Sequence, residues 1–160
     1  MRKKRKIIAF FTLLALFVCM LPNITVKAVS DVNIISSTNT TVEEAKKWAK
    51  SKGATDEFIN LADLYWKYAP EHGNINPALA FVQAAKETGY GKFGGVIDAS
   101  FYNPCGMKVS GGGDDYDQEA HYKFGSWDEG IKAQLDHLAL YAGASGYPKS
   151  SESTADPRHF

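Results

Sequence analysis

The chain has 160 residues, and its 18 basic and 18 acidic side chains cancel formally. They are unevenly distributed, because six Lys and Arg residues but no Asp or Glu lie within residues 1–28. The remaining 132 residues carry 12 basic and 18 acidic side chains, a net charge of about −6. Such a charge argues against nucleic acid as a partner, and this length suffices for one domain with one core.

The N-terminus has the plan of a secretory signal peptide. A cationic run at residues 2–6 precedes an apolar stretch at 7–21, and Val26-Lys27-Ala28 offers small-residue spacing for cleavage after Ala28. A retained membrane anchor is the alternative, but the apolar run is shorter than the ~20 residues that span a bilayer. Lipid attachment at Cys19 is disfavoured by the bulky residue before it. We expect a secreted, cell-wall protein, monomeric and not membrane-bound after cleavage.

Two helices are predicted after a polar linker at residues 29–40. Thr41-Val42-Glu43-Glu44 fits a capping box, and the helix that it begins should end near Ser51. A second helix should begin after Thr55 and close at Pro70. Its apolar residues fall on one stripe, formed by Phe58, Leu61, Ala62, Tyr65 and Ala69.

A third helix should open at Asn76-Pro77 and end before Gly89. Between residues 78 and 85 all side chains but Gln83 are apolar, which predicts a helix that is buried on every side.

Glycine-rich loops should follow, with a short strand at 119–124. A second capping box at residues 126–129 predicts a last helix ending at Gly143, with Trp127, Ile131, Leu135, Leu138 and Tyr141 on one side. The predicted fold class is mainly α (α+β), with a small β-lobe near residues 107–125.

Glu87 is the first candidate for catalysis. It stands at the end of the helix predicted to be buried, and burial and a helix C-terminus both disfavour a charged carboxylate. Both effects would help Glu87 to hold a proton near neutrality, as a general acid must. The alternative is a Glu that emerges into solvent in the last turn.

Three sequence blocks carry a family resemblance. Residues 84–92 (AAKETGYGK), 101–108 (FYNPCGMK) and 121–130 (HYKFGSWDEG) resemble, in this order, the motifs of the bacterial glucosaminidases, glycoside hydrolase family 73. The resemblance covers roughly residues 55–145. It implies a lysozyme-like fold in a domain at 41–160, a peptidoglycan substrate, and Glu87 as the catalytic acid. Such domains usually continue further, so the domain is expected to be incomplete at its C-terminal end.

By this resemblance the enzyme cleaves the β-1,4 bond on the N-acetylglucosamine side of glycan strands. A second carboxylate could come from the acidic segment of the small lobe, where Asp115, Asp117 and Glu119 are the candidates. The substrate's 2-acetamido group could instead serve as the nucleophile. The candidates for substrate binding combine possible sugar-stacking aromatics with polar residues of the second block: Tyr90, Tyr102, Asn103, Lys108 and Tyr122.

No cofactor or metal is expected. The acidic segment lacks the Gly and the final carboxylate of an EF-hand loop, and the four His residues lack metal-ligand spacing. Three rival functions stay open: a lytic transglycosylase of the same fold, a peptidase or amidase using Cys105 with His121, and a non-catalytic wall-binding module.

Overall fold

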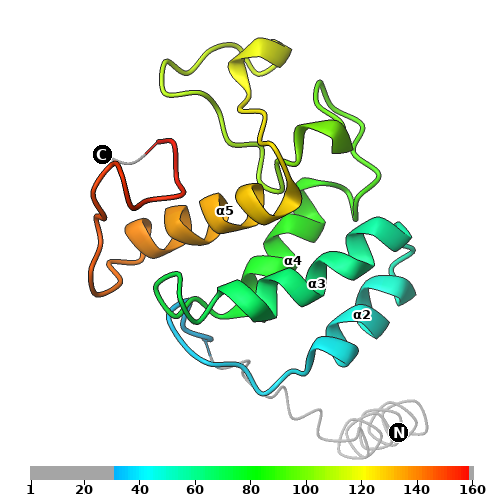
Figure 1. The fold of residues 1–160 in the computed structure, drawn as a ribbon. Helices are drawn as coiled ribbons and strands as arrows, with labels where there is room; N and C mark the ends of the chain where they lie inside the picture. The colour runs from blue at the N-terminus through cyan, green and yellow to red at the C-terminus, as the bar shows by residue number, and fades with distance from the viewer. Residues whose placement is uncertain (1–30, 159–160) are drawn as a thin grey trace, which may run out of the picture. The chain divides into compact units, whose positions relative to one another are not determined.

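The computed structural model describes residues 31–158, so the predicted signal peptide lies outside the described residues. This part of the chain is mainly helical (Figure 1). Its α-helices are α2 (Val42–Ser51), α3 (Asp56–Tyr68), α4 (Pro77–Glu87) and α5 (Trp127–Tyr141), and its short 3-10 helices are η1 (Ala99–Phe101) and η2 (Gln118–Ala120).

The predicted caps begin three of the helices. Thr41 Oγ1 accepts from the Glu44 amide at 3.2 Å, and the Glu44 carboxylate accepts from the Thr41 amide at 2.8 Å, which completes the capping box of α2. Thr55 caps α3 by accepting from the Phe58 amide. Asn76 accepts from the first free amides of α4, directly before Pro77. These three helix starts are confirmed.

The predicted capping box of α5 is wrong in one detail. Ser126 Oγ accepts from the Glu129 amide at 3.3 Å, as expected. The Glu129 carboxylate, however, accepts from the amide of Gly125 at 2.9 Å, one residue before the cap.

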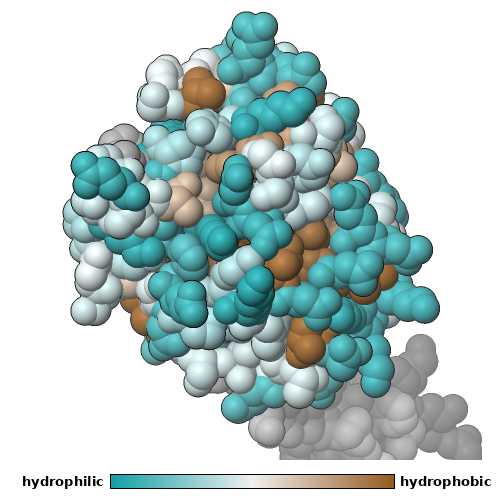
Figure 2. Space-filling view, viewed as in Figure 1, coloured by the Kyte–Doolittle hydropathy of each residue, from teal (hydrophilic) through white to brown (hydrophobic). Residues whose placement is uncertain are grey.

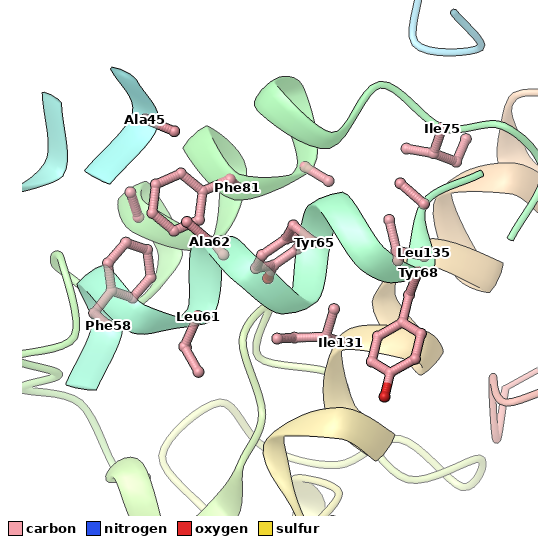
Figure 3. Packing of buried hydrophobic residues seen from close by; sticks show 14 of the residues in the cluster. Ala45, Phe58, Leu61, Ala62, Tyr65, Tyr68, Ile75, Phe81, Ile131 and Leu135 are labelled. Atoms are coloured by element: carbon pink, nitrogen blue, oxygen red, sulfur yellow. The ribbon is translucent and has the colours of Figure 1, made fainter. Parts of the chain in front are cut away.

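The core forms where α3, α4 and α5 meet (Figure 3). The ring of Phe81 stacks on Phe58, with centroids 4.9 Å apart, and meets the edge of Tyr65 at 5.6 Å. Ile131 and Leu135 of α5 are fully buried on the other side of α3. The predicted α3 stripe is confirmed, since all five of its residues are buried.

The buried faces of α4 and α5 differ from those that the sequence predicted. Val82 of α4 is 46% exposed, so α4 is not buried on every side. Tyr141, predicted on the inner side of α5, is 70% exposed. The buried side of α5 instead includes two polar residues, Gln134 and Asp136. Gln134 is satisfied, because its amide accepts from Tyr65 Oη at 2.5 Å and donates to Gln83 Oε1 at 2.8 Å.

The segment predicted as a linker contacts the helices. The Asn76 amide donates to the carbonyl of Ile34 at 2.7 Å, and Ile35 forms an isolated antiparallel bridge with Ile75. The Trp66 indole donates to the Thr40 carbonyl at 3.1 Å.

Residues 88–125, between α4 and α5, form what we term the loop lobe, which lies beyond the adjoining ends of these helices (Figure 1). The strand predicted at 119–124 is wrong. In its place stand η2 and one isolated antiparallel bridge, Lys108–His121. A local hydrogen bond explains the difference, because Asp117 accepts from the Glu119 amide at 3.0 Å and so initiates a 3-10 turn.

Residues 144–158 fold back along α5 and are tied to it by Asp136. This buried carboxylate accepts hydrogen bonds from the Tyr147 hydroxyl, from Lys149 Nζ at 2.9 Å and from the Ala155 amide at 2.7 Å. It also contacts His72 Nδ1 at 2.7 Å. Burial by itself raises the pKa of Asp136, but these partners outweigh burial and hold the pKa below its ordinary value.

The face seen in Figure 2 is largely hydrophilic, with small hydrophobic areas. Within residues 31–158 no helix combines the length and apolar character needed to cross a bilayer.

Candidate active site

A pocket of about 240 Å³ brings α4 and the loop lobe together. Glu87 and Asp115, which are far apart in sequence, both line it. The other lining residues are Phe93, Gly95, Val96, Ile97, Asn103, Gly106 and His121. Two carboxyl groups on one small pocket are the arrangement that glycosidic bond cleavage uses.

Glu87 is the last residue of α4 and is exposed, so the expectation that it is buried is wrong. The buried residue is its neighbour Thr88, whose hydroxyl donates to the Ala84 carbonyl at 2.7 Å and accepts from the Gly91 amide at 3.0 Å. These bonds fix the turn that follows α4, where Gly89 takes a φ of 57°. Glu87 therefore stands at the open end of a helix whose backbone is firmly held.

Asp115 is held at the pocket by Lys108. Lys108 Nζ contacts its carboxylate and also donates to the Gly113 carbonyl at 2.7 Å. The hydrogen bond from Lys108 is the main cause that lowers the pKa of Asp115, and the nearby His121 acts in the same direction. Asp115 therefore carries its charge in neutral solution.

The other two predicted carboxylates do not line this pocket. Asp117 uses its side chain to cap η2, and Glu119 is an exposed residue within η2. Of the three candidates in the acidic segment, Asp115 alone shares the pocket with Glu87.

Asn103 has a structural task that conflicts with its predicted role in substrate binding. It is buried, and its amide Nδ2 donates to the carbonyls of Met107 at 2.8 Å and Tyr122 at 2.9 Å. Its Oδ1 accepts from the amides of Met107 at 2.9 Å and Cys105 at 3.4 Å. Because these bonds use both donors and both lone pairs of the amide, the structure assigns Asn103 to holding the turn rather than to the sugar.

The three predicted tyrosines lie apart from this pocket. Tyr90 packs against Trp48, with ring centroids 5.9 Å apart, and Tyr122 packs against Phe124 at 4.7 Å. Tyr102 meets Trp127 edge to face at 5.6 Å. Tyr102 and Trp127 both line another pocket, of about 520 Å³, along α3 and the start of α5. Of the three predicted tyrosines, Tyr102 therefore lines this second pocket.

Sequence reasoning missed two residues that line the pocket. His121 and Phe93 line the pocket, although the sequence singled out His121 only as a partner of Cys105 and did not single out Phe93. His121 belongs to the third sequence block, which was the available signal. Phe93 lies in a loop at a φ of 56°, where no periodicity could have identified it.

Cys105 lacks the features of a nucleophile. The residue as a whole is half-buried, but its thiol group lies in a buried environment, and burial raises its pKa to about 12. The Nδ1 atom of His121 is engaged with the Asp117 carbonyl at 2.9 Å. A thiol that burial keeps neutral is a poor nucleophile, which argues against a peptidase or amidase that uses Cys105 with His121. Residues 31–158 also contain no group of three or more His, Cys, Asp or Glu side chains that could hold a metal ion.

Comparison with known proteins identifies the family. The glucosaminidase family model, described as mannosyl-glycoprotein endo-beta-N-acetylglucosaminidase, matches residues 62–160. Because the match covers more than half of the chain, the chain belongs to the glucosaminidase family, and its general class is that of a peptidoglycan-hydrolysing glycosidase. No curated protein and no solved structure matches the chain.

Proposed function

We propose that this protein hydrolyses the β-1,4 glycosidic bond on the N-acetylglucosamine side of peptidoglycan strands, with Glu87 as general acid and Asp115 as the second carboxylate. The observation that carries the proposal is the shared pocket of Glu87 and Asp115 within the family domain. A lysozyme-like arrangement of the helices is part of this proposal.

In the proposed reaction, Glu87 donates a proton to the glycosidic oxygen as the bond from the anomeric carbon to that oxygen breaks. The leaving sugar departs with a hydroxyl group, and positive charge develops on the ring that remains. Asp115 suits the opposite task, because its partner Lys108 keeps it ionised. Water then attacks the anomeric carbon and gives up a proton. Asp115 takes that proton if it acts as the base. If Asp115 only stabilises the positive charge, or if the 2-acetamido group has first bonded to the anomeric carbon and is displaced by water, the proton returns to Glu87.

Because Glu87 is exposed, the bound substrate itself would have to shield this carboxyl group from water. The free protein does not exclude water from this carboxyl group. A bound glycan strand would cover the pocket and exclude that water, which strengthens the interactions inside it.

Digestion of purified peptidoglycan tests the proposal. The Glu87→Gln variant should fold normally, since the amide has the same shape at an exposed site, and should lose ~10²-fold or more of the activity. Glu119→Gln is the matched control, because it removes an exposed carboxyl group of the loop lobe that lies off the pocket. A folded Glu87→Gln enzyme with near wild-type activity would refute the proposal. Anhydro-sugar products in place of reducing ends would identify a transglycosylase.

We further propose export to the cell wall after removal of residues 1–28. N-terminal sequencing of secreted material tests this, and a mature protein that begins at Met1 or carries lipid on Cys19 would contradict it.

A further inference from the structure

Lys108 belongs to the second family block, which suggested a contact with the substrate. Its ammonium group is instead directed into the loop lobe, where it contacts the Asp115 carboxylate and donates to the Gly113 carbonyl. The Lys108 side chain is only 21% exposed, whereas that of Asp115 is 84% exposed. The lysine is therefore covered by the loop, while the carboxylate that it holds remains open to a ligand.

The loop between these residues has little stiffness of its own. It contains three consecutive glycines at positions 111–113, and Gly112 and Gly113 take φ values of 67° and 142°. One backbone bond, from the Gly112 amide to the Val109 carbonyl at 2.8 Å, closes its first turn. A glycine-rich loop of this kind needs an added contact to keep an exposed carboxylate in one place.

Lys108 can supply that contact because its own backbone is anchored. It forms the isolated bridge with His121, and the flanking bonds join the Val109 amide to the Ala120 carbonyl at 3.0 Å and the Tyr122 amide to the Met107 carbonyl at 2.8 Å. Lys108 thus extends from backbone that is hydrogen-bonded to residues 120–122 to the glycine-rich loop.

We propose that Lys108 is a positioning residue that anchors the Asp115 carboxylate at the pocket containing Glu87, and that it does not itself bind the glycan. This inference rests on the proposed function of Asp115. The hydrogen bond from Lys108, and to a smaller extent the nearby His121, lower the pKa of Asp115 and so favour its ionised form. Lys108 therefore fixes the place of the carboxylate and also favours its charged form.

Steady-state kinetics on a soluble glycan substrate, together with a double-mutant cycle, test this role. Lys108→Met should lower kcat roughly 10-fold with KM almost unchanged, since a displaced catalytic group slows the chemical step. Lys108→Arg should restore most of the rate because it keeps the cation. In an Asp115→Asn background, Lys108→Met should have little further effect. Lys123→Met serves as control, because this lysine of the same lobe lies over the ring of Phe101 instead.

The outcomes separate the two proposals. An inactive Asp115→Asn with a fully active Lys108→Met overturns the positioning role alone. A fully active Asp115→Asn removes Asp115 from the proposed reaction, and the role of Lys108 is overturned with it. A raised KM at constant kcat in Lys108→Met would show that Lys108 binds substrate.

A titration of the wild type covers the case in which Lys108→Met does not fold. The Asp115 carboxyl carbon, followed by NMR, should titrate below the ordinary Asp value of about 3.9. A titration midpoint at or above that value would overturn the proposal that Lys108 anchors the Asp115 carboxylate.

Discussion

The helices and the loop lobe are stabilised in different ways. The helices bury a continuous apolar core in which Phe58, Tyr65 and Phe81 pack ring to ring. In the loop lobe the buried apolar cluster is small and centres on Met107 and Phe124. Its shape depends instead on specific polar contacts, chiefly those of Asn103 and Lys108. Each region supplies one candidate catalytic carboxylate, so the site combines a rigid helix end with a loop held by a few bonds.

The largest expected effect is on the helical region. Asp136→Asn removes the buried charge to which His72, Tyr147 and Lys149 are bonded, and should cost roughly 3–5 kcal/mol in the free energy of unfolding. Asp63→Asn is the control, since the Asp63 carboxylate is largely exposed and its ion pair with Lys46 should contribute little. Chemical denaturation measures both.

The destabilisation caused by Asp136→Asn should also depend on pH. The folded-state pKa of Asp136 lies below its unfolded value, so the stabilisation is present above about pH 4 and is lost as the pH falls through the folded pKa. The stability gap between wild type and Asp136→Asn should therefore narrow under acid conditions. A gap that widens as the pH falls would contradict this assignment.

The second effect concerns the contact between the two regions. A Cβ at Gly130 of α5 would lie 1.8 Å from the Tyr102 carbonyl oxygen. Ala normally stabilises a helix by about 1 kcal/mol relative to Gly, but here the clash should dominate and Gly130→Ala should destabilise by about 3 kcal/mol. Gly111→Ala, with no atom within 4 Å, should be nearly neutral. Equal melting temperatures for both variants would show that the contact is not tight.

A smaller and local effect is expected at Asn103. Asn103→Ala leaves the Met107 amide and the Tyr122 carbonyl without their side-chain partner, at about 2 kcal/mol. Hydrogen exchange should speed up at amides of the loop lobe while amides of α3 stay protected. The exposed Asn60→Ala on α3 is the control. Uniform loss of protection would mean that the two regions unfold as one unit.

The smallest effect is expected at Cys105. Cys105→Ser should retain wild-type activity, because burial keeps the thiol neutral and raises its pKa to about 12. At pH 8 its alkylation should be much slower than that of a free small thiol, because little of it is thiolate. Rapid alkylation that abolishes activity, together with an inert but folded Cys105→Ser, would restore the Cys–His alternative.

Parts of the site could be predicted from local sequence, and parts could not. The block around Glu87 identified the candidate acid and the end of its helix. Its exposure could not be predicted, because it depends on which face of α4 meets α3 and α5. The acidic segment offered three carboxylates without distinguishing them, since all three are charged residues in one short stretch. Asp115 is distinguished from the other two because the path of the loop relative to the end of α4 places it at the pocket with Glu87.

The sequence by itself determined the helix starts and the buried stripe of α3, because caps and periodicity act between residues a few positions apart. The tertiary structure alone decided that Asn103 holds a turn, that Lys108 faces Asp115, and that Asp136 binds the C-terminal segment. By contrast, η2 stands in place of the predicted strand for a local reason, because the Asp117 side chain caps it. The bonds from Asn103 to Tyr122 and from Asp136 to His72 and Ala155 depend on which distant segments meet, and local preference does not specify that.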